Sequence, residues 1–246
     1  GSYSVDLQSV AANGVVTGSV ASFSFFYDPT LPAAPLIVSV SDDTNNVLDG
    51  VTRDNTLVIA GTGVPGSALE LFFDNALIAA TVIDALGNWQ VDYTGTVLVD
   101  GSYVLSAESI VMTLRSATSP QFVVVVDTVV PAAPVITGIS TDSGTAGDGI
   151  TSDNSLIISG TAEAGAEVAV LLDGSSIGTT TAGAGGSWSL DYSGTVLADN
   201  SYVLSASATD VAGNGSALSA AFAITIDTGA PAAPVITGIC SAGDTR

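Results

Sequence analysis

Nearly all side chains of this chain that could take part in chemistry are carboxylates. Its 246 residues include 24 Asp and Glu, three Lys and Arg, a single cysteine and no histidine. Without histidine there is no Ser-His-Asp triad and no histidine-ligated zinc or haem, and one cysteine forms neither an intrachain disulfide nor a multi-cysteine metal site. Carboxylates do bind hard cations, since Ca²⁺ takes about six to eight oxygen ligands. The composition therefore favours cation binding over nucleophilic catalysis.

Six carboxylates lie where we expect loops or strand ends, positions that the ends of neighbouring β-sandwiches could bring together around Ca²⁺. They are Asp127, Asp148, Asp153, Glu163, Asp210 and Asp227. Asp and Asn are also good turn formers, so any one of the six could serve only to shape a loop. A carboxylate pair for glycoside hydrolysis stays open by number alone. No pair is singled out, however, and the copying of whole units described next argues against a dedicated active site.

A four-residue phrase sets the organisation of the chain. Pro-Ala-Ala-Pro begins at residues 32, 131 and 231, spacings of 99 and 100 residues, and an aspartate (Asp28, Asp127 or Asp227) stands four positions before each. A fixed period of this size indicates one domain copied in tandem. We predict a first copy at 28–127 and a second copy at 128–227. Residues 1–27 match the last strands of a preceding copy, and 228–246 match the first strand of a following one, so we expect a segment of a longer array.

Within each copy all local signals indicate β-structure, because short apolar or alternating runs are bounded by Gly, Asn, Asp and Ser. Seven short strands in about 100 residues are typical of an immunoglobulin-like sandwich. The fold class predicted is all-β: tandem immunoglobulin-like seven-stranded β-sandwiches in an extended array, with Trp89 and Trp188 between the sheets. The strands are expected at 36–40, 56–62, 68–73, 76–82, 88–93, 103–110 and 120–126, and at 135–139, 155–161, 166–172, 175–181, 187–192, 201–208 and 219–226.

The proline phrase also predicts how the copies are joined. Proline fixes its own φ and restricts the residue before it, so Pro-Ala-Ala-Pro favours an extended, stiff connection. Only residues 128–130 separate Asp127 from the next Pro-Ala-Ala-Pro. So little slack predicts a rod with restricted hinges rather than beads on a flexible string.

Five ordered motifs of the second copy carry a resemblance to a known family. They are Gly160–Ala166, Gly186–Leu190, Leu197–Tyr202, Ala208–Asn214 and Asp227-Thr228 leading into Pro-Ala-Ala-Pro. Together they resemble the bacterial Ig-like repeat of giant secreted adhesins, the BapA/SiiE type and related RTX adhesins. The resemblance implies seven-stranded sandwiches in tandem on the cell surface, export by a type I system, and Ca²⁺ bound near domain junctions.

The copies differ at the motif positions that the resemblance connects with Ca²⁺. The first copy has Val64 where the second has Glu163, and Val111-Met112 near the place of Asp210. We therefore expect Ca²⁺ at the junction that follows Asp227 rather than at the junctions of Asp28 and Asp127.

The net charge of −21 restricts the possible partners. Affinity for nucleic acids and anionic membranes comes from Lys and Arg, so neither is expected as a partner. The longest apolar stretch, 122–136, contains Asp127 and two prolines and is too short to span a bilayer. We therefore expect no membrane insertion by this segment.

These observations predict a mechanical function. We expect a non-enzymatic stalk or fibre segment of a bacterial extracellular adhesin, cell-surface or biofilm protein, rigidified by Ca²⁺ at some domain junctions. Its partners would be neighbouring Ig-like repeats of the same polypeptide, with a host or surface ligand bound through other domains. Self-association into fibres is the alternative, as the subunit of an extracellular filament or S-layer-like polymer, because exposed edge strands favour it. A carbohydrate-binding accessory module is a third reading.

Overall fold

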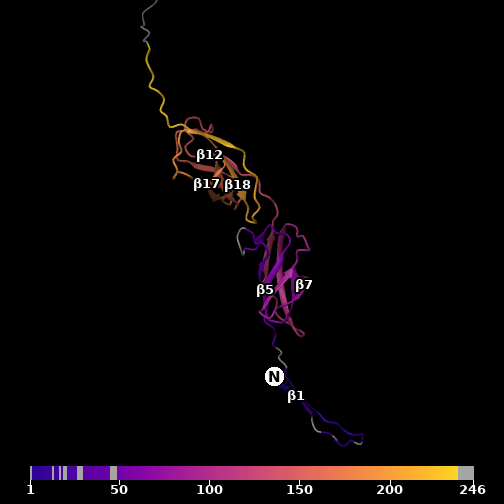
Figure 1. The fold of residues 1–246 in the computed structure, drawn as a ribbon. Coiled ribbons are helices and arrows are strands. Elements are labelled where there is room, and N and C mark those ends of the chain that lie inside the picture. The colour runs from indigo at the N-terminus through magenta and orange to yellow at the C-terminus, as the bar shows by residue number, and fades with distance from the viewer. Residues whose placement is uncertain are drawn as a thin grey trace, which may run out of the picture. The chain divides into compact units, whose positions relative to one another are not determined.

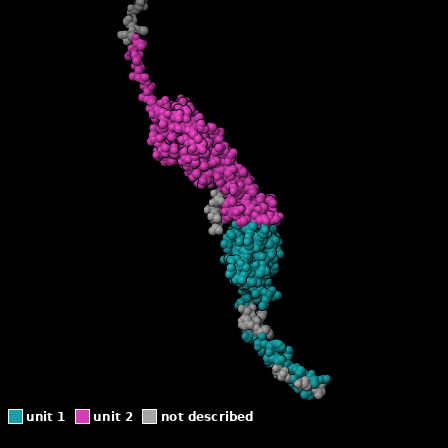
Figure 2. All heavy atoms as spheres, viewed as in Figure 1, with its two compact units in different colours: residues 1–40, 58–93, 103–123 teal, residues 41–57, 94–102, 124–246 magenta. Residues whose placement is uncertain are grey.

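A computed structural model of the chain describes residues 2–12, 14–16, 18, 21–26, 30–44 and 49–237. Asp28 lies outside the described residues, so the expectations for its junction are not tested. The described chain forms two compact units (Figure 2). Unit 1 comprises Gly1–Val40, Val58–Tyr93 and Tyr103–Val123, and unit 2 comprises Ser41–Leu57, Thr94–Ser102 and Val124–Arg246. Unit 2 therefore includes two loops of the first copy, and the division into copies at 28–127 and 128–227 stays a prediction.

The second copy folds as two antiparallel sheets with one short parallel addition, and β12, β17 and β18 are labelled in Figure 1. Its strands are β12 (Val135–Ile139), β13 (Ile150–Thr151), β14 (Ile157–Thr161), β15 (Glu167–Leu172), β16 (Ser175–Thr181), β17 (Ser187–Asp191), β18 (Asn200–Thr209) and β19 (Phe222–Ile226). One sheet has the order β12-β14-β17 and the other β13-β19-β18-β15-β16. A three-stranded sheet opposite a larger sheet that contains the last strand is typical of an immunoglobulin-like sandwich.

The first copy has the same strand order. Its strands are β3 (Leu36–Val40), β4 (Val51–Thr52), β5 (Val58–Thr62), β6 (Ala68–Phe73), β7 (Ala76–Val82), β8 (Asn88–Asp92), β9 (Gly101–Val111), β10 (Leu114–Arg115) and β11 (Phe122–Val126). They form β3-β5-β8 and β4-β11-β9-β6-β7, with β10 on β9. The predicted class, all-β with tandem immunoglobulin-like sandwiches, is confirmed. The strand count of seven misses the two-residue strands β4, β13 and β10.

The core of the second copy follows from period-2 alternation in its strands. In β15 the side chains of Val168 and Val170 are fully buried while Glu167 is exposed. Trp188 lies in the same apolar cluster with 4% of its surface exposed, and Trp89 is equally buried in unit 1, which confirms both tryptophans as core residues. A Cβ on Gly160 would come within 2.3 Å of the Trp188 ring, so only glycine lets β14 pass beneath the indole.

A tyrosine contact fixes the start of β18. The Tyr202 hydroxyl donates to the carbonyl of Ala198 at 3.1 Å. A tyrosine early in this strand that bonds backward to the preceding corner is typical of immunoglobulin-like sandwiches.

The N-terminal residues form a hairpin of β1 (Ser2–Leu7) and β2 (Ala21–Phe26). Ser2 pairs with Phe26, as Ser201 pairs with Thr225 in the β18–β19 hairpin. The sequence alignment of the copies equates these same pairs, so the two hairpins share one register. Within the described ranges, no helix is long and apolar enough to cross a membrane.

Candidate functional site

The turn after β18 contains a buried carboxylate, Asp210, and a buried amide, Asn214. The backbone N–H of Asp210 donates to the carbonyl of Asn214 at 3.0 Å, and the N–H of Gly213 donates back to the carbonyl of Asp210 at 3.1 Å. Gly213 has φ of 90°, a conformation that favours glycine. These bonds close residues 210–214 into a tight loop, which we call the 210–214 turn.

The carboxylate of Asp210 is the buried centre of the 210–214 turn. Asp210 is 3% exposed and Asn214 is 7% exposed. One carboxylate oxygen of Asp210 accepts from the backbone N–H of Asn214 at 2.8 Å, and the other accepts from its side-chain amide at 2.9 Å. A buried charge is costly unless hydrogen bonds compensate it. Asn214 supplies that compensation through two donors at once.

Two other segments of unit 2 reach the 210–214 turn. The side-chain amide of Asn214 also donates to the carbonyl of Asp127, just after β11, at 2.8 Å. The hydroxyl of Thr44 donates to the carbonyl of Ala212, and the guanidinium of Arg53 donates to the carbonyl of Gly213 at 2.8 Å. The turn therefore meets the residue that ends the first copy and a loop of the same copy.

Aspartates also fix the residues that follow the last strand of each copy. The N–H and hydroxyl of Thr128 both donate to Asp100, at 3.0 and 2.9 Å. Thr228 makes the same pair of bonds to Asp199, at 3.1 and 2.8 Å. Both joints thus begin with a threonine tied to an acidic loop residue of its own copy.

The predicted ligands Asp127 and Asp227 have equivalent backbone roles. Asp127 accepts from the N–H of Val129, and Asp227 accepts from the N–H of Gly229, each at 3.0 Å. Each side chain bonds the backbone two residues on, which shapes a local turn. The carboxylates at the two joints therefore hold the chain that leaves each last strand.

Asp148 and Asp153 flank β13. Asp148 accepts from the N–H of Ile150 at 2.9 Å. Asp153 accepts from the N–H and hydroxyl of Ser155 at 3.0 and 2.9 Å. The Ser155 N–H is the largest influence that lowers the pKa of Asp153 below its ordinary value. Both carboxylates cap loop backbone in the way turn-forming aspartates do.

The six predicted ligands fall into two groups at opposite ends of β18. Asp210 follows the last residue of β18, whereas Asp227 follows Ile226, which pairs with the first residue, Asn200. A strand of 10 residues is about 30 Å long. Asp210 and Asp227 therefore cannot share an ion. The antiparallel pairing of β18 and β19 places Asp210 at the opposite end from the junction that follows Asp227, and Ca²⁺ binding at either end stays a prediction.

The remaining predicted ligands join one group or the other. Glu163 is exposed in the turn before β15, and Glu167 of that strand pairs with Thr209, so Glu163 belongs to the Asp210 end. Ile150 pairs with Thr225 on β19, so Asp148 and Asp153 belong to the Asp227 end. Among the residues that the structure describes, no three acidic or cysteine side chains converge as metal ligands do.

The donor set at the 210–214 turn nonetheless suits a hard cation. Its oxygens are the Asp210 carboxylate and the carbonyls of Asp127, Ala212 and Gly213, and the amide nitrogen of Asn214 donates to the first two. Ca²⁺ accepts mixed carboxylate and carbonyl oxygens of this kind.

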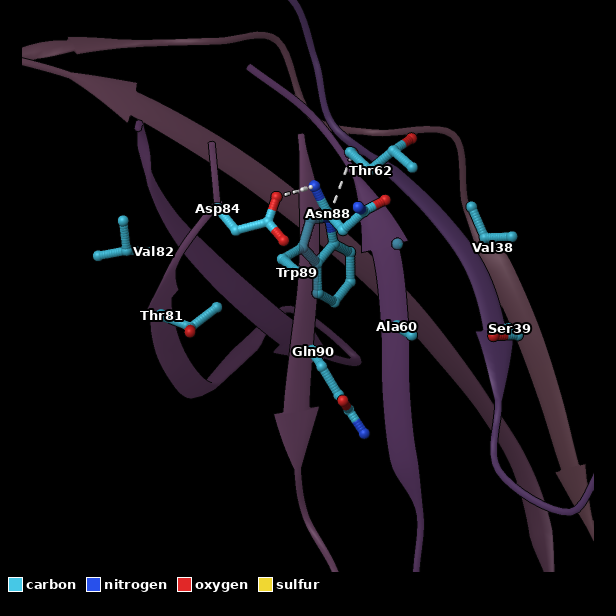
Figure 3. A pocket seen from close by; sticks show the side chains of 11 residues that line it. Val38, Ser39, Ala60, Thr62, Thr81, Val82, Asp84, Asn88, Trp89 and Gln90 are labelled. Carbon is cyan, nitrogen blue, oxygen red and sulfur yellow. Dashed lines mark hydrogen bonds between the residues drawn. The ribbon is translucent and has the colours of Figure 1, made fainter. Parts of the chain in front are cut away.

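A hollow beside Trp89 offers no comparable chemistry. It is an open depression of about 480 Å³ over β3, β5 and β8, lined by Val38, Asn88 and Gln90 among others (Figure 3). The Trp89 indole N–H donates to the carbonyl of Thr62 at 3.1 Å, and its ring is buried. The indole thus serves the core and presents no flat platform to a sugar.

A family assignment agrees with this geometry. Residues 130–228 match the family described as the bacterial Ig-like domain. The 210–214 turn and the loops that carry Asp148, Asp153 and Glu163 all lie inside the matched residues. Among curated protein sequences, none matches the chain.

Three solved structures are similar to the chain at low identity. The fibronectin(III)-like modules of CbhA from Clostridium thermocellum share 16% identity over 76% of this chain and 93% of theirs, with a TM-score of 0.42. A biofilm-associated protein BSP domain shares 18% identity over 81% of this chain and 30% of its own, with a TM-score of 0.30. A tetra-tandem repeat from the extending region of a large adhesion protein shares 22% identity over 93% of this chain and 57% of its own, with a TM-score of 0.32. The chain therefore covers about a third of the length of the BSP-domain structure and just over half of the length of the tetra-tandem repeat.

Sequence reasoning overlooked several residues that act at this site. Asp100 and Asp199 could have been found, since they and their threonine partners occupy matching positions in the two copies. Thr44 and Arg53 could not, because their contacts join segments about 160 residues apart in the chain.

Proposed function

We propose that the chain is a structural segment of a bacterial extracellular adhesin, cell-surface or biofilm protein, and that its work is to hold other domains at a distance. The observation that carries the proposal is the repeated joint: Thr128 on Asp100 and Thr228 on Asp199, with the same two hydrogen bonds each. Both copies repeat the same Asp–Thr pair at the start of the linker, and such a repeated pair serves the connection between sandwiches rather than a reaction. The match of residues 130–228 to the bacterial Ig-like family supports this reading.

The proposed role requires no catalysis by this segment. Its partners are neighbouring Ig-like repeats of the same polypeptide, and a host or surface ligand is bound by other domains. A net charge of −21 opposes contact with nucleic acid and anionic membranes. The location we propose is extracellular, at the bacterial cell surface.

Electron microscopy of the chain in dilute solution tests the mechanical role. We expect separate thin particles of uniform length for the wild type. Removing one anchor with Asp100→Ala widens the distribution of bend angles, because Thr128 loses both bonds that fix the start of the linker. Compact particles, or a bend distribution that Asp100→Ala leaves unchanged, would contradict the proposal.

We further propose that Ca²⁺ stabilises the joint at Asp127 by binding at the 210–214 turn. Support comes from the carboxylate and carbonyl oxygens around the turn and from Asp210, a carboxylate kept almost fully out of water. Binding to the folded state alone stabilises it by mass action, about 2.7 kcal/mol at one hundred times the dissociation constant.

Calorimetric titration of the chelator-treated chain measures this binding. Heat of binding and a higher melting temperature are expected with Ca²⁺ for the wild type, and neither for Asp210→Ala. Asp148→Ala at the opposite end of the domain is the control and keeps the binding. Absence of both signals in the wild type would reject calcium at this joint.

One observation favours the alternative of a self-associating subunit. The edge strand β7 has the sequence ALIAATV and pairs only with β6, and its Leu77 and Val82 are 57% and 65% exposed. The corresponding strand β16 reads SSIGTTT. An uncharged, apolar edge strand is a template for pairing with another chain.

Sedimentation velocity over a range of concentrations distinguishes the two functions. A self-associating subunit forms larger species with rising concentration. Leu77→Lys abolishes them, and Ser176→Lys at the corresponding place on β16 leaves them intact. A wild-type chain that stays monomeric at high concentration rejects this alternative.

A further inference from the structure

Arg53 is placed unlike the other described arginine. Arg115 is paired with Glu70 and Glu108 at 2.7 and 2.9 Å, and these carboxylates raise its pKa. Arg53 follows β4 and donates instead to a neutral acceptor, the carbonyl of Gly213 in the 210–214 turn. The chain has 24 carboxylates that could pair with an arginine. The hydrogen bond of the Arg53 guanidinium to a backbone carbonyl therefore suggests a specific role for this residue.

Thr44 and Arg53 act together on two adjacent carbonyls. Thr44 donates its hydroxyl to the carbonyl of Ala212, and the same hydroxyl oxygen accepts from the backbone N–H of Arg53 at 3.2 Å. A guanidinium is weakly hydrated and presents several donors in a fixed plane, which suits it to capping carbonyls at a surface. The loop of the first copy thus supplies one hydroxyl and one positive charge to the turn.

The second copy provides an internal comparison. Ser143 and Ser152 occupy the places of Thr44 and Arg53, and the N–H of Ser152 donates to the Ser143 hydroxyl at 2.8 Å. The backbone arrangement of this loop therefore forms without an arginine. The guanidinium is an addition of the first copy, and it donates to the turn.

We infer that Arg53 is the protein's own cation at the Asp127 joint, and that it fastens the 210–214 turn without metal and opposes the binding of a divalent cation there. The two cations use the same acceptor, since the Gly213 carbonyl that Arg53 caps belongs to the oxygen set that suits Ca²⁺. The Arg53 guanidinium and a divalent cation at the same carbonyl are both positive, so they repel each other. The opposition to metal rests on the proposed calcium site, whereas the metal-free fastening does not.

Arg53→Ser tests the inference, because serine is the residue of the second copy. Arg115→Ser is the matched control, with the same change of charge inside unit 1. Arg53→Lys separates charge from geometry, since lysine keeps the charge without the planar set of donors. Both positions, Arg53 and Arg115, are exposed to solvent, so the three variants keep the core intact.

The metal-free fastening is measured in chelator. Spin labels at Gln90→Cys and Ser189→Cys, corresponding exposed positions of the two copies, give a distance distribution by pulsed electron resonance in a Cys240→Ser background. We expect a broader distribution with Arg53→Ser and no change with Arg115→Ser. An unchanged distribution in Arg53→Ser overturns the fastening.

The opposition to metal is measured by titration with CaCl₂. We expect Arg53→Ser to bind about three- to tenfold more tightly than wild type, the size of one ordinary net hydrogen bond. Arg53→Lys stays near wild type, and Arg115→Ser equals wild type. Equal or weaker binding by Arg53→Ser overturns this half. If neither protein binds Ca²⁺, the calcium proposal fails together with this half, while the distance measurement still decides the fastening.

Discussion

Replacing Asp210 with alanine should unfold the second copy at distinctly lower denaturant. The change removes the acceptor of two hydrogen bonds, at 2.8 and 2.9 Å, from a residue pair that is 3% and 7% exposed. Each donor left without a partner in a buried site costs about 1–3 kcal/mol. The side-chain amide of Asn214 keeps its bond to Asp127, and loss of a buried charge returns part of the cost. A net loss of about 2–4 kcal/mol follows.

Urea unfolding in chelator measures this loss. A Trp89→Phe background leaves Trp188 as the fluorescent reporter of the second copy. The control is Asp191→Ala, which also removes two bonds, from the N–H and hydroxyl of Ser193 at 2.9 and 2.6 Å. Asp191 is exposed, so its loss should cost less than about 1 kcal/mol. Equal losses for Asp210→Ala and Asp191→Ala would refute the argument that burial gives these bonds their weight.

Three further outcomes follow from the described contacts. Gly160→Ala should destabilise the second copy by about 1–3 kcal/mol through overpacking, whereas Gly185→Ala, with open space around its Cβ, should be neutral in the same urea assay. Asp153 has a pKa lowered in the folded state, so it contributes stability above about pH 4; Asp153→Asn should be less stable at pH 7, with the difference vanishing as the pH falls through the folded pKa. Trp89→Phe should lower the free energy of unfolding of its copy by about 1 kcal/mol more than Trp188→Phe does. Of the two indole N–H groups, that of Trp89 has a hydrogen-bond partner in the structure and that of Trp188 has none. Equal losses in the unfolding curves of the two variants would show that this bond contributes nothing.

The strands could be predicted because each copy repeats its alternation of apolar and polar residues. The expected strand at 166–172 lies within one residue of β15, and both tryptophans occupy the core. The short strands β4 and β13 could not be predicted, because two residues carry no alternation and only their parallel pairing to the last strand defines them.

The grouping of the acidic residues could not be predicted because it depends on strand direction. Asp210 and Asp227 are 17 residues apart in the sequence, yet β18 and β19 run antiparallel and put them at opposite ends of the domain. Asp127 is much farther from Asp210 in sequence and lies beside the 210–214 turn. A motif of ordered acidic residues therefore indicates a binding chemistry without indicating which of its members act together.

Comparison of the copies separates what builds a joint from what occupies it. The positions that agree, Asp100 with Asp199 and Thr128 with Thr228, make identical bonds and fix the start of each linker. One position that differs in charge, Arg53 against Ser152, donates to the turn of the second copy. A repeat can thus keep one scaffold for all its joints and alter a single loop residue to change how each joint answers cations. If so, the response of the Asp127 joint to Ca²⁺ is set by the copy that precedes it as much as by the domain that carries the ligands.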